Sequence, residues 1–159
     1  LSTGFLFQEK TYERKLRKDM LEQLKIPVHL IPRLRAGEDY TAADGTVYPN
    51  EAITMQSPAP RSYAFCSDTA YYEQIIPVIE GASLLYHETT FMNDREANAA
   101  DKFHATTGQA ATIAAKAGVK KLLIGHYSAR YDELQPLLDE ARAVFPETEL
   151  TIDGSIFEI

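Results

Sequence analysis

The sequence predicts an α/β fold, and three observations lead to this prediction. From Pro60 onward, short apolar runs alternate with segments of helical periodicity, which is the pattern of α/β proteins with a largely parallel sheet. One helical segment, 107–117, is rich in alanine and is followed by Gly118, and glycine commonly ends helices. The chain has 159 residues, of which 45% are hydrophobic, so it suits one globular domain and is too apolar for a disordered chain.

The first 60 residues contain fewer regular signals than the rest. Residues 3–7 are short and apolar and predict a strand. Residues 12–24 carry leucine and methionine at helical spacing and predict a helix that ends at the Ile26-Pro27 pair. The segment 27–60 is interrupted by proline and glycine and predicts irregular chain, with a short hairpin strand at 46–48. An irregular stretch of this length usually protrudes or has a function.

After Pro60 each element follows the last at short intervals. Apolar runs predict strands at 62–66, 82–86, 121–125 and 149–152. Helical periodicity predicts helices at 71–79, 94–102, 107–117 and 132–144. We therefore expect a sheet of strands joined by helices over this part of the chain.

The net charge is −7, from 16 Lys and Arg against 23 Asp and Glu, and it is unevenly distributed. An acidic balance argues against binding nucleic acid or anionic membrane over the whole surface. Residues 1–35, however, hold eight basic and four acidic residues, a net charge of +4, whereas the remainder has −11. The basic segment is either a site for a polyanion or a solvated amphipathic helix.

The cysteine count and the hydropathy exclude two classes of protein. The one cysteine, Cys66, cannot form an internal disulfide, so a disulfide-stapled scaffold is excluded, and its apolar surroundings predict a core residue. No apolar run approaches the roughly 18 residues of a membrane-spanning helix, and we expect no membrane association.

Polar side chains follow three of the predicted strands. Asp68 comes after 62–66, His87 and Glu88 come after 82–86, and His126 comes after 121–125. Ligand sites in α/β sheets gather at the carboxyl ends of strands. Imidazole together with carboxylate suits zinc or another first-row divalent metal. These residues therefore predict a metal or acid–base site, the alternative being structural hydrogen bonds.

A second group of polar residues surrounds the start of helix 107–117. Thr106 or Thr107 can cap this helix, whose N-terminus suits a phosphate, and His104 beside it could donate a proton to a leaving oxygen. Arg130 could bind a phosphate through its guanidinium. The alternatives are a structural histidine and a surface ion pair, and we expect His29 to be structural or solvent-exposed.

Four short motifs, in order along the chain, give the sequence a family resemblance. Residues 67–69 resemble an aspartate motif, residues 87–91 a His-Glu-Ala-Thr-Phe motif, residues 104–106 a His-Ser-Thr motif, and residues 125–131 a closing His-x-Ser-x-Arg-Tyr motif. With these motifs the sequence resembles the ribonuclease Z family, the tRNA 3′-processing endonucleases of the metallo-β-lactamase superfamily.

The resemblance implies a fold and a division of the chain. The 159 residues would be the C-terminal half of a metallo-β-lactamase αββα sandwich, with the N-terminal half absent and Leu1 directly following it. Residues of about 10–59 would include the protruding arm that grips tRNA, and residues 60–159 would form the sheet-and-helix body. A half-sandwich would expose a sheet edge and an apolar face.

The resemblance also implies roles for single residues. Asp68 would bridge two zinc ions and His126 would be a terminal metal ligand, with another divalent metal as the alternative to zinc. His104 would donate a proton to the departing 3′ oxygen with Glu88 as its partner, and Arg130 and Thr106 would contact the substrate phosphate. The family's His-x-His-x-Asp-His signature, which supplies the other ligands, is absent, so we expect the chain alone to be inactive.

The expected function is that of the complete protein. It would hydrolyse precursor tRNA at the 3′ trailer by a two-metal mechanism, as a cytoplasmic homodimer. Two alternatives stay open: another hydrolase of the superfamily, such as a phosphodiesterase or an arylsulfatase-like enzyme, and a non-catalytic tRNA-binding homologue.

Overall fold

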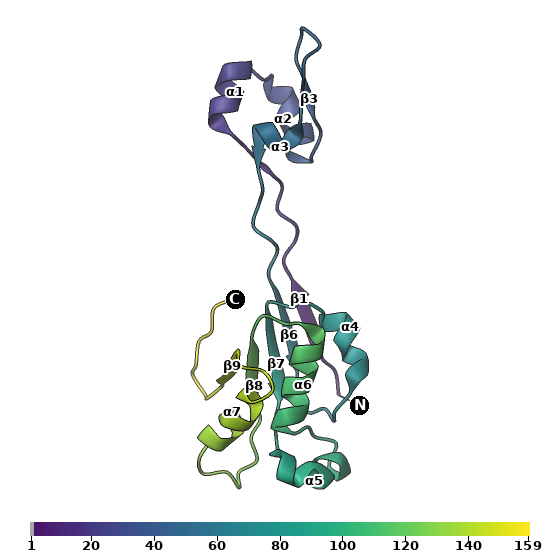
Figure 1. Cartoon of the computed structure of the whole chain (residues 1–159), viewed down its shortest axis with the longest axis vertical. Coiled ribbons are helices and arrows are strands. Elements are labelled where there is room, and N and C mark those ends of the chain that lie inside the picture. The colour runs from purple at the N-terminus through teal and green to yellow at the C-terminus, as the bar shows by residue number, and fades with distance from the viewer. Residues whose placement is uncertain (1) are drawn as a thin grey trace. The chain divides into compact units, whose positions relative to one another are not determined.

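The computed structural model describes residues 2–159 and divides them into two compact units. The first unit, here called the body, comprises the residues up to Glu9 together with Arg61–Ile159; the second, the inserted unit, is Lys10–Pro60 (Figure 1). Each unit has a buried hydrophobic cluster of its own. Within residues 2–159, no helix combines the length and the apolar character that crossing a membrane requires.

The body is built on a five-stranded sheet with the strand order β1-β6-β7-β8-β9. The strands are β1 Phe5–Gln8, β6 Ser62–Cys66, β7 Leu84–Glu88, β8 Leu122–Gly125 and β9 Thr148–Leu150. β1 pairs antiparallel with β6, and β6 to β9 are parallel. Because Cys66 pairs with His87 and Glu88 with Gly125, the carboxyl ends of β6, β7 and β8 lie together at one end of the sheet.

One face of the sheet is covered by helices (Figure 1). The helical elements of the body are η2 Glu73–Ile75, α4 Ile76–Ile79, η3 Asn93–Arg95, α5 Glu96–Asp101, α6 Thr107–Ala117 and α7 Gln135–Arg142. Leu85, Leu122 and Ile124 of the strands are fully buried with Ile113 of α6. Each such side chain contributes roughly 1.5–3 kcal/mol by leaving water, so this layer holds the body together.

Cys66 belongs to the same core. The side chain is buried at the end of β6, as its apolar surroundings predict. Burial raises the pKa of its thiol to about 11, because an apolar environment disfavours the thiolate. A thiol of this kind packs and does not act as a nucleophile at neutral pH.

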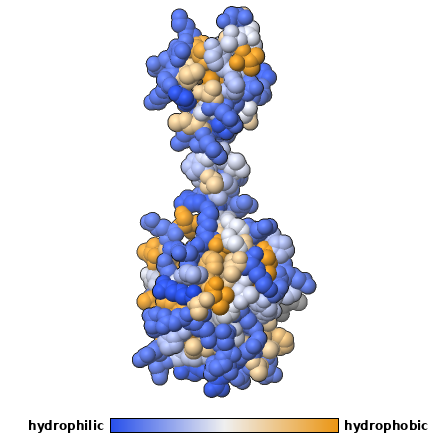
Figure 2. Space-filling view, viewed as in Figure 1, coloured by the Kyte–Doolittle hydropathy of each residue, from blue (hydrophilic) through white to orange (hydrophobic). Residues whose placement is uncertain are grey.

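The opposite face of the sheet carries a row of aromatic side chains. Neighbouring rings along this row lie 4.9–6.5 Å apart between centroids; the residues are Phe5, Phe7, Tyr63, Phe65 and Tyr86. Phe5 and Phe7 are 55% and 59% exposed, and hydrophobic side chains are visible on the surface of the body (Figure 2). An apolar sheet face left at the surface is typical of a face that another layer covers.

The inserted unit is small but has its own architecture. Its elements are β2 Lys15–Leu16, α1 Lys18–Leu24, η1 Val28–Leu30, α2 Ile31–Arg35, β3 Tyr40–Thr41, β4 Val47–Tyr48, α3 Asn50–Ile53 and β5 Thr54–Met55. β2 pairs with β5 and β3 with β4, both antiparallel. Ile26, Leu34, Tyr40 and Ile53 form its buried centre. Both strand pairings and the buried centre thus lie entirely within residues 10–60.

Charge distinguishes the two units. The inserted unit has eight basic and seven acidic residues, a net charge of +1, and the body has eight basic and 16 acidic residues, a net charge of −8. All eight basic residues of the inserted unit lie in residues 10–35. Three of them, Arg17, Arg33 and Arg35, form ion pairs. Lys10, Lys15, Lys18 and Lys25 are exposed and have no salt bridge among residues 2–159.

The structure confirms most predicted elements and corrects three. The strand 62–66 and the helix 107–117 have the predicted bounds. The helix predicted from residue 12 begins at Lys18, because Lys15 and Leu16 pair with β5 instead. The segment 27–60, predicted to be irregular, contains short helices and strands held by the cluster around Leu34. The strand predicted at 82–86 is β7, which begins at Leu84 and continues through His87 and Glu88.

Candidate metal and acid–base site

Asp68 lies in the turn that follows β6. Its backbone is in the left-handed region, at φ 50°, where residues other than glycine are uncommon. The turn is tied to the sheet by the backbone N–H of Thr69, which donates to Oε1 of Glu88 at 3.0 Å. The side chain of Asp68 is 66% exposed, and its Oδ1 lies 3.0 Å from Nε2 of His126. The sheet thus presents this carboxylate at its end, open to a ligand.

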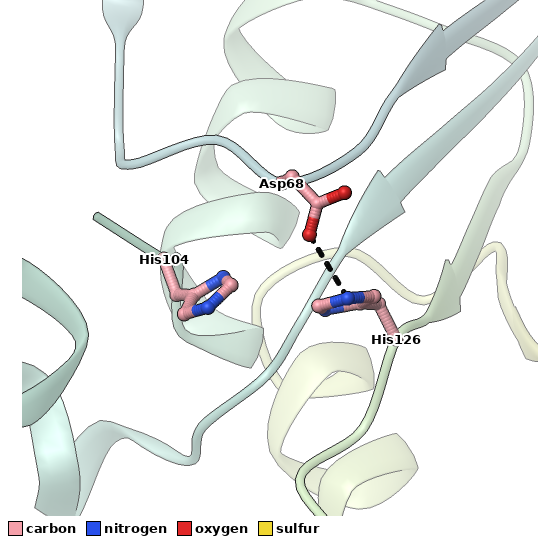
Figure 3. Close-up of side chains that lie close together, drawn as sticks. All are labelled: Asp68, His104 and His126. Atoms are coloured by element: carbon pink, nitrogen blue, oxygen red, sulfur yellow. Dashed lines mark ion pairs between the residues drawn. The ribbon is translucent and has the colours of Figure 1, made fainter. Parts of the chain in front are cut away.

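His126 occupies the equivalent place after β8. Its φ is 61°, so two strand ends reach the site through a left-handed residue. The turn is closed behind it by Tyr127, whose hydroxyl donates to the carbonyl of Ile124 at 2.5 Å. Burial raises the pKa of Tyr127 to about 12. Nδ1 of His126 lies 2.8 Å from Oγ1 of Thr90, which leaves Nε2 facing Asp68 (Figure 3).

Glu88 is a fully buried carboxylate with all its acceptor capacity in use. Oε1 accepts from the Thr69 N–H at 3.0 Å and lies 2.7 Å from Nδ1 of His104. Oε2 accepts from the Thr90 N–H at 3.1 Å and the Thr90 hydroxyl at 2.7 Å. A buried carboxylate is tolerated only with such partners. Glu88 therefore anchors the turns after β6 and β7 and the imidazole of His104.

His104 reaches the site from the loop before α6. The preceding residue, Phe103, has a left-handed backbone with a φ of 58°. Its side chain is 75% exposed, whereas the imidazole of the next residue turns inward to the site. Nδ1 is bonded to Glu88, so Nε2 is the nitrogen left for a ligand or a proton transfer. The ring lies 5.3 Å from that of His126 between centroids.

Three ligand atoms therefore meet in one place. One side-chain atom each from Asp68, His104 and His126 lies within 4.8 Å of the others (Figure 3). Two imidazoles and a carboxylate are a donor set for zinc and other first-row divalent metals. Both imidazoles bond through Nδ1 to an oxygen, as metal-ligating histidines usually do with their second nitrogen. These residues fit a divalent metal.

The two predicted phosphate contacts lie nearby. The guanidinium of Arg130 stacks over Phe91, 5.1 Å from the ring centroid, and that ring lies 6.2 Å from His104. Thr106 is the N-cap of α6, as one of the two predicted capping residues, and forms a capping box with Gln109. Its hydroxyl donates to Asn93 at 2.7 Å and accepts from the Gln109 N–H, so the side chain is already engaged in hydrogen bonds within the chain. A phosphate contact from Thr106 or Arg130 stays a prediction.

His87, grouped with Glu88 at a predicted strand end, is not part of the cluster. Because β7 continues through both residues, their side chains leave the sheet on opposite faces. His87 is fully buried, its Nδ1 donates to the carbonyl of Glu88 at 2.8 Å, and burial lowers its pKa. Its Nε2 has no hydrogen-bond partner among residues 2–159. It belongs to the core beneath the site.

Sequence reasoning missed the residues that connect the site. Thr90 bonds to both Glu88 and His126, and Glu140 of α7 accepts hydrogen bonds from the Asn93 N–H and the Thr107 hydroxyl. Tyr131 accepts from the Met92 N–H at 2.9 Å. Thr90 and Tyr131 lie inside the quoted motifs, whereas Glu140 lies 14 positions after His126 with no local pattern to mark it.

The chain is similar to curated ribonuclease Z proteins. It is 46% identical to that of Parabacteroides distasonis over 151 residues, which is 95% of this chain and 50% of that protein. It is 48% identical to that of Porphyromonas gingivalis W83 over 147 residues, 92% of this chain and 48% of that protein. The chain thus spans about half the length of the curated relatives it matches. No family model matches the sequence.

A solved structure supports the fold. The metallo-β-lactamase fold protein YhfI from Bacillus subtilis superposes with a TM-score of 0.58 and 28% identity, over 62% of this chain and 40% of that one. The α/β fold predicted from the element pattern and the relation to metallo-β-lactamase fold proteins predicted from the motifs are both confirmed. The resemblance to the ribonuclease Z family is also confirmed.

Proposed function

Because the chain is homologous to curated ribonuclease Z proteins over more than nine tenths of its length, we propose that the complete protein is a metal-dependent endoribonuclease. Its reaction is hydrolysis of the phosphodiester bond that joins the 3′ trailer to precursor tRNA, with zinc as the metal. The convergence of Asp68, His104 and His126 beside a buried Glu88 is the observation that carries this proposal.

Asp68 and His126 are the proposed metal ligands of this chain. Their ligand atoms are 3.0 Å apart, face one another and lie at the ends of rigid strands. A divalent metal there supplies Lewis-acid charge to the phosphoryl oxygens and lowers the pKa of a bound water. The hydrogen bond from Nδ1 of His126 to Thr90 fixes the ring orientation, so that Nε2 stays available.

His104 and Glu88 are the proposed acid–base pair. Glu88 holds Nδ1 of His104 and stabilises the protonated ring, and Nε2 delivers the proton to the departing 3′ oxygen. Arg130, whose guanidinium lies over Phe91, contacts the substrate phosphate by charge. Thr106, at the N-terminus of α6, is buried and bonded to Asn93 and Gln109, so a phosphate contact from it would require the exchange of one of these bonds. Each role uses a side chain of the body.

The site of this chain is half of the proposed catalytic centre. The relatives are twice as long, and among the described residues Asp68, His104 and His126 are the one group of three or more His, Cys, Asp or Glu side chains close enough together to hold a metal. We propose that the second half supplies the ligands for two zinc ions, covers the aromatic face of Phe5, Phe7 and Tyr63 to complete an αββα sandwich, and that the 159-residue chain alone does not cleave RNA.

The inserted unit is the proposed tRNA-binding arm. Four exposed lysines without salt bridges among residues 2–159 offer a surface for a polyanion on an otherwise acidic protein.

We propose further that the complete protein is a cytoplasmic homodimer. Light scattering after gel filtration measures the oligomeric state, and a monomer would contradict it.

The proposal is tested by measuring cleavage of precursor tRNA with added zinc, once by the complete protein and once by the 159-residue chain. We expect trailer removal only by the complete protein, with about two zinc ions per protomer. Turnover by the isolated chain would contradict the half-site. A preference for a small phosphodiester over tRNA would favour another superfamily hydrolase, and a metal-free, inactive complete protein would favour a non-catalytic homologue.

A further inference from the structure

One buried hydroxyl lies between the two parts of the site. Oγ1 of Thr90 is 2.7 Å from Oε2 of Glu88 and 2.8 Å from Nδ1 of His126. Thr90 is 7% exposed, and its bond to Glu88 is buried, whereas the His126 side chain is 39% exposed. Its backbone takes part as well: its N–H donates to Glu88 at 3.1 Å, and its carbonyl accepts from the Ser128 N–H at 3.2 Å. The loops after β7 and β8 thus meet at this residue.

The number of protons determines the direction of the hydrogen bonds. A threonine hydroxyl has one proton to donate and lone pairs to accept with. The proton goes to Oε2 of Glu88, which is an acceptor. Toward His126 the hydroxyl can then only accept, so Nδ1 of His126 must carry a hydrogen. In the neutral ring this leaves Nε2 without a proton and free for a metal. Without a metal, the Asp68 carboxylate, 3.0 Å from Nε2, competes with Thr90 because it favours a proton on Nε2.

We infer that Thr90 is a positioning residue, whose hydroxyl holds His126 in the Nδ1–H tautomer and joins this imidazole to the Glu88–His104 pair. The catalytic meaning of this link rests on the proposed function, but the tautomer does not. A residue one position earlier provides the contrast: Thr89 is fully buried too, and its hydroxyl donates to the carbonyl of Gly125 at 3.1 Å, away from both imidazoles.

The direct test is nitrogen NMR of the imidazoles in the 159-residue chain, metal-free and at a pH where the rings are neutral. The chain has four histidines, and His126→Gln assigns the relevant signals. The comparison is made in an Asp68→Ala background, which removes the carboxylate that faces Nε2. We expect the Nδ1–H tautomer of His126 with Thr90 intact, in Thr90→Ser and in Thr89→Val, and loss of this preference in Thr90→Val. An unchanged tautomer in Thr90→Val would overturn the inference.

The second readout is the affinity of the complete protein for Zn²⁺, measured by competition with a chromophoric chelator. Loss of an outer partner of a ligating histidine typically weakens metal binding by about 10–100-fold, so we expect a loss of about 10-fold in Thr90→Val. Thr90→Ser and Thr89→Val should stay within about threefold of the wild type. Equal losses in Thr90→Val and Thr89→Val would show a general packing effect and contradict the positioning role.

Two further outcomes distinguish this inference from a folding defect and from the proposed function. If Thr90→Val does not fold, as judged by circular dichroism, Thr90→Ala replaces it and carries the same expectations. If the tautomer and the affinity change as expected but the complete protein does not cleave precursor tRNA, the proposed function fails and the role of Thr90 stands.

Discussion

The body and the inserted unit each have eight basic residues, but they differ in net charge and in architecture. The body, at −8, gathers its polar chemistry at the ends of three parallel strands and secures it with a fully buried Glu88. The inserted unit, at +1, has two two-stranded sheets around a small core and leaves four lysines exposed without salt bridges among residues 2–159. Under the proposed function, the reaction chemistry belongs to the body and the attraction of a polyanion to the inserted unit.

The largest expected effect contrasts a histidine from each unit. In the complete protein, His126→Ala should lower precursor-tRNA cleavage by about 10³-fold or more, equivalent to about 4 kcal/mol of transition-state stabilisation, because a metal ligand is lost. His29→Ala removes an exposed histidine of the inserted unit and should change cleavage less than about twofold. Steady-state kinetics together with zinc content measure both, and retained zinc with full activity in His126→Ala would refute the metal site.

The second contrast is the loss in free energy of unfolding when a buried polar side chain is removed from each unit. Glu88→Ala leaves the Thr69 N–H, the Thr90 N–H and the Thr90 hydroxyl without their acceptor, and should cost about 3–5 kcal/mol. Asn50→Ala in the inserted unit removes an amide that donates to the carbonyls of Leu34 and Glu38, and should cost about 1–3 kcal/mol. Urea unfolding followed by circular dichroism measures both, and equal losses would contradict a special role for the buried carboxylate.

The third contrast is electrostatic. Replacing Lys15, Lys18 and Lys25 together by glutamine should raise KM for precursor tRNA about 10-fold and flatten its salt dependence, because fewer counterions are released on binding. kcat for a small phosphodiester should not change. Lys120→Gln, at an exposed lysine of the body, is the control and should leave KM for tRNA unchanged. A larger effect from Lys120→Gln would move the RNA-binding surface to the body.

Local signals made the body predictable. The strand 62–66 and the helix 107–117 have the predicted bounds because a compact apolar run and a threonine-to-glycine cap pair mark their ends. The inserted unit lacks such signals: Lys15 and Leu16 form a strand only because Thr54 and Met55, distant in sequence, pair with them. Its short elements depend on a shared core rather than on their own propensity.

The same distinction applies to the site. Asp68 and His126 could be predicted because they lie within two residues of the ends of apolar strands. The position of Glu88 inside β7, opposite in direction to His87, depends on where the strand ends, and apolar patterning does not fix that point. Thr90 could not be assigned a role from sequence, because its hydroxyl acts between residues two and 36 positions away.

The smallest expected effect concerns two exposed residues with a left-handed backbone. Phe103 in the body has a φ of 58°, and Lys25, the C-cap of α1 in the inserted unit, has a φ of 47°. Glycine adopts this conformation without steric cost, so Phe103→Gly and Lys25→Gly should each raise the free energy of unfolding by up to about 1 kcal/mol, reduced by the greater entropy of glycine in the unfolded chain.

Their effects on activity should differ although their effects on stability are similar. Phe103 directly precedes His104, so a glycine there gives the imidazole more conformational freedom and should lower kcat by a few fold. Lys25→Gly should leave kcat unchanged, because no side chain of the metal and acid–base site lies in the inserted unit. Chemical denaturation and single-turnover cleavage of the complete protein measure the pair. Equal kcat values would mean that the rigidity of the loop before α6 has no part in positioning His104, and that Glu88 alone aims the ring.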